Sequence, residues 1–314
     1  MRDMKIITLT LNPAFDIHCY VENFLPFHEN LAEITDRQAG GKGVNISRAL
    51  VVNRVENLAL VVLGEENAEN FRKSLDLDKI EYCEITVKGR IRENITIHTS
   101  GADETRISFS GFDTDASLLE ATEEAIAEVV GKGSFVTFTG RVPSGLSMTN
   151  VKTFLRRLQE SGANLVIDSR SFSLDDLIEI KPWLIKPNQE EISEYLGQNI
   201  TSFEQAVTSA QELYKKGIDN VMISLGDKGA LLVCGEGVFE ATPPRVEAIS
   251  TIGAGDSSIA GFLAASVNGL SFCDRLRTAV AYGTAACMTS GTKPPRADDI
   301  DAVLKQIIVK EIKI

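Results

Sequence analysis

Apolar positions along the chain follow two patterns, short buried runs and longer amphipathic stretches. The short runs predict core strands, and the stretches with i, i+3, i+4 spacing predict helices. The expected strands are 6–11, 58–63, 134–139, 164–168, 183–188 and 221–226. The expected helices are 67–75, 118–130, 149–161 and 203–215, followed by a hairpin over 229–241. This alternation predicts an α/β fold of three layers, with a mainly parallel sheet covered by helices on both faces.

Four other stretches alternate polar and apolar residues and lie outside this succession of strands and helices. They are 17–21, 30–38, 89–97 and 105–109. Alternation is typical of half-exposed strands, so we assign these stretches to a small β-sheet lid inserted in two pieces. The lid is expected to comprise residues 12–38 and 89–111. The α/β nucleotide-binding and catalytic domain is expected to comprise residues 1–11, 39–88 and 112–314.

The composition narrows the range of partners. A net charge of −12 disfavours nucleic acid and anionic membranes, so an anionic substrate would require locally concentrated positive charge. The five cysteines form no C-x-x-C pair and the three histidines lack metal-ligand spacing, which indicates free thiols in a reducing compartment. The first residues show no signal-peptide pattern, and no apolar run reaches membrane-spanning length. We therefore expect a cytoplasmic protein that acts on small molecules.

A Gly-Ala-Gly-Asp sequence at residues 253–256 carries a chemical signal. Its small residues allow a ligand to approach the backbone, and the apolar spacing after it predicts a helix that begins near Gly255. Amides at such a helix start form an anion site. Asp256 beside them is a candidate general base. The same four residues also suit a tight turn with a helix cap, and on their own they favour that structural interpretation.

A second glycine turn, Gly40-Gly41-Lys42-Gly43, leads into another predicted helix. It lacks the Ser or Thr that follows Gly-Lys in a Walker A loop, so it is not a P-loop. A lysine in such a turn suits a phosphate-bearing ligand, although the turn also serves as a plain helix entry. Arg90 and Arg92 are expected at alternate positions of one strand, so they would share a face, as they would on a solvated edge strand.

Three motifs occur together: Gly40-Gly41-Lys42-Gly43 with Asn45, Asn188-x-x-Glu191, and Gly253-Ala254-Gly255-Asp256. In this order and spacing they resemble the ribokinase/PfkB family of sugar kinases, over essentially the whole chain. Residues 10–16 and 185–188 look like the branch that acts on phosphorylated ketohexoses. Within it, residues 89–94 and 109–112 look closest to bacterial 1-phosphofructokinases, while tagatose-6-phosphate kinases share most of the framework.

The resemblance implies a ribokinase-like fold and ATP-dependent phosphorylation of a phosphorylated ketohexose, with fructose 1-phosphate converted to fructose 1,6-bisphosphate. Asp256 would take the proton from the sugar hydroxyl, while the amides of Gly253, Ala254 and Gly255 hold the phosphoryl oxygens. The residues implied for ATP are Lys186, Asn188, Ser224, Gly226 and Gly229. Asn188 and Glu191 would organise Mg²⁺ and its waters. The residues implied for the sugar and its phosphate are Asp16, Gly41, Lys42, Asn45, Arg90, Arg92 and Arg141.

One position departs from the pattern of the branch. Arg141 stands where the branch usually has a small hydroxyl residue that faces the sugar phosphate. The arginine either adds a bidentate phosphate contact or reshapes the pocket for another sugar. A kinase of tagatose 6-phosphate or fructose 6-phosphate therefore stays open. The basic cluster argues against a neutral sugar, and an intact Asp256 argues against a non-catalytic sugar-phosphate sensor.

The lid also suggests a partner. Apolar residues expected to be exposed on its strands, such as Val21, Phe24 and Ile34, would suit pairing with a second copy of the chain. The lid is therefore the expected surface of a homodimer, although the family includes both monomers and dimers.

Overall fold

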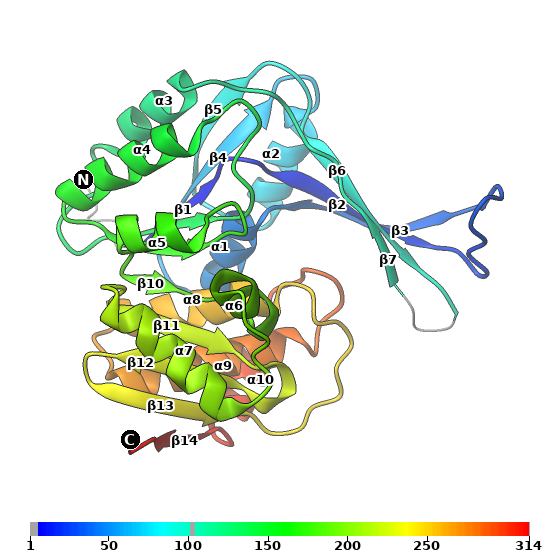
Figure 1. The fold of residues 1–314 in the computed structure, drawn as a ribbon. Helices are drawn as coiled ribbons and strands as arrows, with labels where there is room; N and C mark the ends of the chain where they lie inside the picture. Colours follow the sequence, from blue (N-terminus) through cyan, green and yellow to red (C-terminus); the bar gives the residue numbers. More distant parts are fainter. Residues whose placement is uncertain (1–5, 101–103, 314) are drawn as a thin grey trace.

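The main sheet of the computed structural model, which describes residues 6–100 and 104–313, has ten strands (Figure 1). Their order is β14-β13-β12-β11-β10-β9-β8-β1-β4-β5. The strands from β11 to β5 pair in parallel, and β12, β13 and β14 pair antiparallel at the other edge. Their bounds are β1 Ile6–Thr10, β4 Leu58–Gly64, β5 Tyr82–Val87, β8 Phe135–Thr139, β9 Asn164–Asp168, β10 Leu184–Ile185, β11 Asn220–Ser224, β12 Ala230–Cys234, β13 Gly237–Thr242 and β14 Ile308–Glu311.

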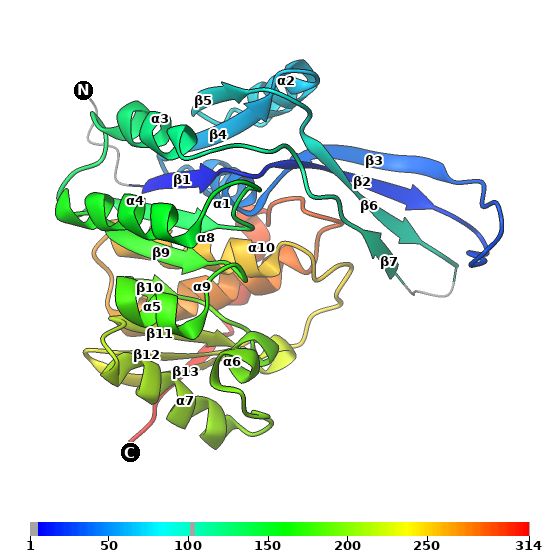
Figure 2. The ribbon, with the colours of Figure 1, turned by 45° about the horizontal axis from the view of Figure 1, so that its top comes forward.

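Helices cover both faces of this sheet (Figures 1 and 2). One face carries α3 Ser117–Ile126, α4 Met148–Glu160, α5 Leu174–Ile180, α6 Gln189–Leu196 and α7 Phe203–Lys215. The other carries α1 Lys42–Val52, α2 Ala68–Leu77, α8 Ala254–Val267, α9 Phe272–Ala286 and α10 Ala297–Leu304. In β1, Ile7 and Leu9 pack toward the first set and Ile6 toward the second, because successive side chains of a strand alternate between the faces.

A second sheet projects from the body of the molecule (Figures 1 and 2). Its order is β3-β2-β6-β7, with β2 and β6 parallel and the other pairs antiparallel. The bounds are β2 Ala14–Tyr20, β3 Glu33–Gly40, β6 Arg92–His98 and β7 Glu104–Ile107. Phe15 and Ile17 anchor the base of this sheet in an apolar cluster with Phe71 of α2. The opposite face of β2 carries Asp16 toward the site described below.

The α/β fold with a mainly parallel sheet and a smaller separate sheet, predicted from the sequence, is confirmed. Some local expectations differ. The helix expected over 118–130 ends at Ile126, whose carbonyl then accepts bonds from the amides of Val129 and Val130 in a closing turn. Val21 was expected to be exposed, but it is 4% exposed, because it follows β2 directly and its amide donates to the carbonyl of His98. No described helix has the length and apolar character needed to cross a membrane.

Candidate active site

Asp256 lies in the first turn of α8, at the centre of the candidate site. The N-cap residue Gly253 has a φ of 80°, a left-handed conformation that costs glycine little. The turn directs backbone amides outward at the positive end of the helix dipole. Asp256 is 7% exposed, and its Oδ2 accepts a 2.9 Å hydrogen bond from Asn45 Nδ2 of α1. Packing of α1 against α8 therefore joins two of the three sequence motifs.

The surroundings of Asp256 make it a better base than an ordinary aspartate. Burial raises the pKa of Asp256 to about 6, and the negative charge of Asp168 acts in the same direction. Lys42, Asn45 and Lys186 act in the opposite direction, because they stabilise the carboxylate. The group is thus ionised at neutral pH and yet binds a proton more readily than an exposed aspartate does, which suits general base catalysis.

Two lysines and a buried carboxylate lie beside this turn. Lys42 Nζ donates a 2.7 Å hydrogen bond to Asp168 Oδ2, and Lys186 Nζ is 3.9 Å from Asp168 Oδ1. Burial alone would raise the pKa of Asp168, but the charges of Lys186 and Lys42 hold it below its usual value. A Cβ built on Gly255 would lie 3.1 Å from Lys186 Nζ, so this ammonium group reaches the anion turn. Lys42 and Lys186 share the single carboxylate of Asp168, so positive charge remains next to the turn, which suits a phosphate.

Asp168 was missed by the sequence analysis. Its signal was its place as the last residue of an expected strand, because side chains at the carboxyl ends of parallel strands converge on the ligand site. Lys42 was expected to hold the phosphate that the sugar already carries. In the structure it contacts Asp168, and the charges of Asp168, Asp256 and Glu191 raise its pKa despite its burial. Lys42 therefore belongs electrostatically to the reacting centre.

The smaller sheet contributes a polar face. Asp16 of β2 accepts a 2.9 Å hydrogen bond from Asn94 Nδ2 and forms an ion pair of 3.4 Å with Arg106 Nη2, both at Oδ1. A Cβ at Gly40 would come within 2.2 Å of Asp16 Oδ2, so any larger residue where β3 passes this carboxylate would displace it. At the entry to α1, Gly41 has a φ of 119°, which likewise favours glycine. Arg106 was missed by the sequence analysis.

The three arginines predicted from the sequence are placed differently from one another. Arg92 is anchored, because its guanidinium group donates to the carbonyls of Asn12, Pro13 and Phe109 at 3.3, 3.4 and 3.0 Å. Arg90 precedes β6, so the expectation that it shares a strand face with Arg92 is wrong. Residues 90 and 91 follow a bend at residues 88–89 and lie outside any strand, and Arg90 Nη2 lies 3.5 Å from Glu93 Oε1.

Arg141 is exposed just beyond β8. Its charge, together with burial and the charge of Arg106, lowers the pKa of Arg92, so these three side chains share one region. None of the described residues forms an ion pair with Arg141.

The predicted nucleotide residues gather around the ends of β10 and β11. The Ser224 amide donates to the carbonyl of Pro187 at 3.0 Å, and Ser224 and Asn188 form an isolated parallel bridge. Gly226 has a φ of 64° and begins a short 3-10 helix. Gly229 has a φ of 99°, and a Cβ there would lie 1.9 Å from the carbonyl oxygen of Ala241. The bridge thus holds this loop beside Asn188, and Gly229 lets it pass close to the Ala241 carbonyl.

Asn188 and Glu191 form a capping box at the start of α6. Asn188 Oδ1 accepts from the Glu191 amide at 2.8 Å, and Glu191 Oε2 accepts from the Asn188 amide at 3.0 Å. Arg170 Nε donates to the other Glu191 oxygen at 2.9 Å. Both side chains are thus held in place, and the described residues include no cluster of three or more acidic, His or Cys ligands for a metal. This donor set fits Mg²⁺ bound mainly by its waters and phosphate oxygens.

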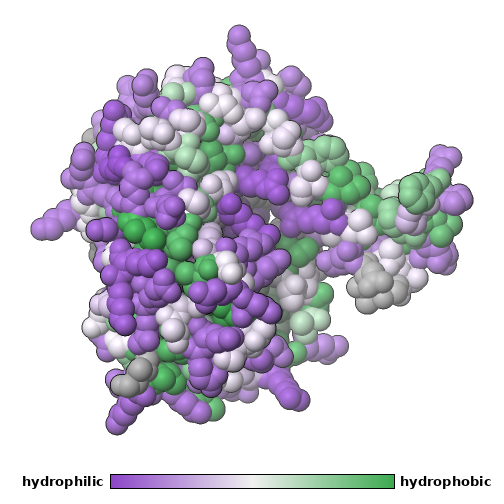
Figure 3. All heavy atoms as spheres, viewed as in Figure 1, coloured by the Kyte–Doolittle hydropathy of each residue, from purple (hydrophilic) through white to green (hydrophobic). Residues whose placement is uncertain are grey.

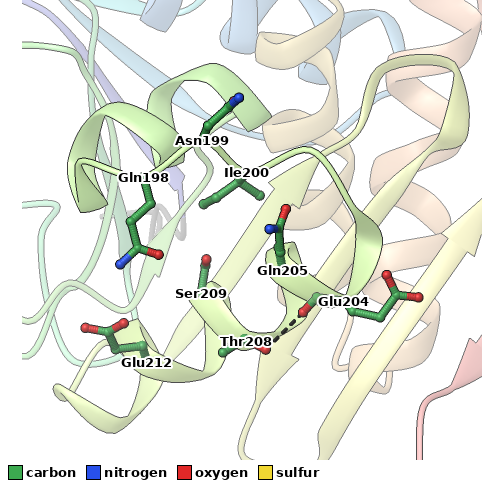
Figure 4. Close-up of a pocket in the computed structure, with 8 residues that line it drawn as sticks. All are labelled: Gln198, Asn199, Ile200, Glu204, Gln205, Thr208, Ser209 and Glu212. Atoms are coloured by element: carbon green, nitrogen blue, oxygen red, sulfur yellow. Dashed lines mark hydrogen bonds between the residues drawn. The ribbon is translucent and has the colours of Figure 1, made fainter.

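The surface also has a hollow that is separate from these motifs. It lies where the loop after α6 meets α7, and it is lined by Gln198, Asn199, Ile200, Glu204, Gln205, Thr208, Ser209 and Glu212 (Figure 4). All of these residues except Ile200 have polar or charged side chains, two of them carboxylates, and the Thr208 hydroxyl donates a hydrogen bond to the Glu204 carbonyl. In Figure 3 apolar residues gather instead on the projecting sheet. The hollow contains none of the residues predicted for catalysis or binding.

Comparison with known proteins identifies the family of the chain. The profile of the pfkB family carbohydrate kinases matches residues 11–299. A 1-phosphofructokinase of Haemophilus influenzae is 30% identical over 98% of this chain and 99% of its own length. A 1-phosphofructokinase of Bacillus subtilis is 32% identical over 90% of this chain and 93% of its own length.

A solved structure shares the fold. The crystal structure of phosphofructokinase-2 from Escherichia coli in complex with potassium superposes with a TM-score of 0.91 at 26% identity, covering 96% of this chain and 99% of that one. The match of sequence profile, relatives and fold confirms the family that the three motifs predicted. The chain belongs to the pfkB family of carbohydrate kinases.

Proposed function

We propose that this kinase transfers the γ-phosphoryl group of ATP to a phosphorylated ketohexose, converting fructose 1-phosphate to fructose 1,6-bisphosphate. One observation carries the proposal: a buried carboxylate with a raised pKa, Asp256, lies in the first turn of α8, where the charges of Lys42 and Lys186 act on it. Phosphoryl transfer requires a base for the hydroxyl and positive charge for the phosphoryl oxygens, and these residues supply both.

In the proposed mechanism, Asp256 takes the proton of the sugar hydroxyl as its oxygen attacks the γ-phosphorus. Asn45 fixes one oxygen of the Asp256 carboxylate and so orients the other toward the hydroxyl. The amides of Gly253, Ala254 and Gly255 hold the transferring oxygens, where they act at the positive end of α8. Lys42 and Lys186 add charge next to the same turn.

ATP would lie along the loop of Ser224, Gly226 and Gly229, with Lys186 near its phosphates. Asn188 and Glu191 would hold Mg²⁺ through water, and the ion would supply charge neutralisation for the triphosphate. The capping box keeps both side chains in one orientation without a bound ion. The protein thereby provides an ordered outer contact for the metal.

The sugar would lie between α1 and the projecting sheet, with Asp16, Gly41 and Asn45 at its hydroxyls. Its own phosphate would meet Arg92 and Arg141, with Arg90 at the rim. The anchoring of Arg92 on three carbonyls supports this, because it fixes a positive charge that forms no ion pair with an acidic residue in the described part of the chain. We further propose that the projecting sheet, with residues 12–38 and 89–111, acts as a lid over the sugar.

The experiment is a comparison of kcat/KM for fructose 1-phosphate, fructose 6-phosphate and tagatose 6-phosphate with Mg-ATP. We expect a preference of at least about a hundredfold for fructose 1-phosphate, or roughly 2.7 kcal/mol of transition-state discrimination. A preference for either 6-phosphate would replace the proposed sugar and would give Arg141 the role of reshaping the pocket. Binding of these sugars without ADP release would identify a sensor instead.

We also propose that the lid pairs with a second copy of the chain. Phe27, Leu31 and Ile34 are 104%, 95% and 64% exposed, and Asn30 holds their loop in shape by bonding to Leu25 and His28. Light scattering should then give a dimer mass, and Phe27→Asp should give a monomer.

We also propose that the protein is cytoplasmic. All five cysteines are free thiols, which fits a reducing compartment.

A further inference from the structure

Arg106 occupies an unusual position on the polar face of the lid sheet. It lies on β7 opposite Thr96 of β6, and Thr96 in turn lies opposite His18 of β2. Its side chain does not extend straight across the sheet to His18. It runs diagonally to Asp16, two residues nearer to the catalytic domain, where Nη2 lies 3.4 Å from Oδ1. The side chain nevertheless stays 48% exposed, so its guanidinium group is open to a ligand.

The charges of this region do not balance. Arg106 and Arg141 both lie close enough to act on Arg92, since burial and then the charges of Arg141 and Arg106 lower the pKa of Arg92. Asp16 is the acidic group that acts on Arg92 in the opposite direction. Three guanidinium groups against one carboxylate leave an excess of two positive charges (3 − 1). A phosphate monoester carries close to two negative charges at neutral pH, so it would complete the balance.

The ion pair between Arg106 and Asp16 can be exchanged for a contact of Arg106 with another anion. At 3.4 Å it is longer than the 2.7–2.9 Å that is usual for charge-assisted hydrogen bonds. Asp16 Oδ1 also keeps a shorter 2.9 Å bond from Asn94, so the carboxylate stays oriented if the arginine leaves. Arginine is suited to the exchange because its planar fork binds phosphate oxygens in pairs.

We propose that Arg106 is a phosphate-binding residue of the sugar site, which exchanges its ion pair with Asp16 for the phosphate that the sugar carries. The proposal deepens the function given above and rests on it. In the free enzyme Arg106 forms an ion pair with Asp16. The phosphate of a phosphorylated sugar draws the arginine away, and Asp16 is then free to accept hydrogen bonds from the sugar hydroxyls. An unphosphorylated sugar would have to break the ion pair without a replacement, so Arg106 acts as a specificity determinant.

The test is a double-mutant cycle on binding, without ATP, measured by titration calorimetry with fructose 1-phosphate. We expect Arg106→Gln to raise Kd at least tenfold and Arg106→Lys to raise it less. If Arg106 binds the phosphate directly, Arg106→Gln still raises Kd at least fivefold in an Asp16→Asn background. A smaller change in that background means that Arg106 acts only through Asp16, and this overturns the proposal.

The matched control is Arg37→Gln. Arg37 lies on β3 of the same sheet, but it pairs with Glu93 and stacks over the ring of Phe15. We expect it to leave the Kd for fructose 1-phosphate and the KM for ATP unchanged, and the KM for ATP should also be unchanged in Arg106→Gln. A loss of binding in Arg37→Gln equal to that in Arg106→Gln would also overturn the proposal, because the effect would then belong to the sheet as a whole.

The proposed function and the role of Arg106 can fail separately. If the enzyme binds fructose 1-phosphate through Arg106 but releases no ADP with any ketohexose phosphate, the proposed function fails and the role of Arg106 stands. If the enzyme turns over fructose 1-phosphate and Arg106→Gln binds it normally, the function stands and the role of Arg106 fails.

Discussion

Lys42 Nζ lies 2.7 Å from Asp168 Oδ2, and this pair links the first glycine turn to the carboxyl end of β9. Asp168 is 5% exposed and also faces Lys186, so one carboxylate restrains both lysines of the reacting centre. The same negative charge raises the pKa of Asp256. Asp168 therefore adds to the effect of burial on the pKa of Asp256, the proposed base.

Asp168→Asn should shift the pH profile. Asp256 must be ionised to act, so the wild-type kcat/KM should fall as pH drops through a midpoint near 6, which is the pKa of Asp256. Removing the Asp168 charge leaves Lys42 and Lys186 unopposed, and both lower the pKa of Asp256. The acid limb of kcat/KM should therefore move to lower pH. An acid limb that stays in place or moves upward would contradict this role of Asp168.

Asp256→Asn should abolish the chemical step but leave ATP binding intact. The amide cannot take up the proton of the sugar hydroxyl, so turnover should fall by roughly two to four orders of magnitude. Steady-state kinetics and equilibrium binding of ATP separate the two effects. Near-normal turnover would remove Asp256 as the base.

The same substitution should stabilise the fold at neutral pH. The pKa of Asp256 is raised from 3.8 to about 6 on folding, so its protonated form is the one that the fold favours. The associated stability is complete below pH 4 and is lost as pH rises through 6. Asp256→Asn should thus be more stable than wild type at pH 8, by on the order of 2–3 kcal/mol, with the gap closing toward pH 4.

Urea unfolding at several pH values measures this gap. Asp219→Asn is a useful comparison, because burial also raises the pKa of Asp219, which lies outside the candidate site. A gap for Asp256→Asn that widens as pH falls would reverse the predicted sign and refute the assignment.

Arg92→Ala should weaken binding of the sugar phosphate far more than binding of ATP. The guanidinium group is preorganised by the carbonyls of Asn12, Pro13 and Phe109, so its loss removes a fixed charge from the proposed phosphate site. We expect the KM for fructose 1-phosphate to rise at least about tenfold, or 1.4 kcal/mol. Equal effects on both KM values would assign Arg92 a structural role.

Glu191→Gln should raise the Mg²⁺ concentration required for half-maximal activity. Glutamine keeps an oxygen that can accept the hydrogen bond from the Asn188 amide, so the capping box survives. The negative charge near the proposed Mg²⁺ is lost. Glu190→Gln is the matched control, since Glu190 also pairs with Arg170 but its side chain is 70% exposed. Titration with MgCl₂ at saturating ATP distinguishes the two variants. Equal shifts would mean that only the general charge of this helix start matters.

The sequence by itself determined the fold class and pointed to Asp256 as the candidate base. Strand–helix alternation predicts the sheet because each local period depends only on neighbouring residues, and the Gly-Ala-Gly-Asp motif predicts α8 and Asp256 for the same reason. The glycine requirement at Gly253 is likewise local, since it arises from a positive φ angle, whereas Gly229 must also pass close to the carbonyl oxygen of Ala241 on β13. Arg90 shows the limit of such reasoning, because a bend before β6 breaks the expected alternation.

Only the tertiary structure decided which charges meet. Lys42 and Asp168 are 126 residues apart, Arg106 and Asp16 are 90 apart, and Asn45 and Asp256 are 211 apart. No local pattern encodes these pairs, because they depend on how α1, α8, β9 and the lid sheet pack together. Burial at their junction then sets the pKa of Asp256, since desolvation is a property of the assembled core and not of any one segment.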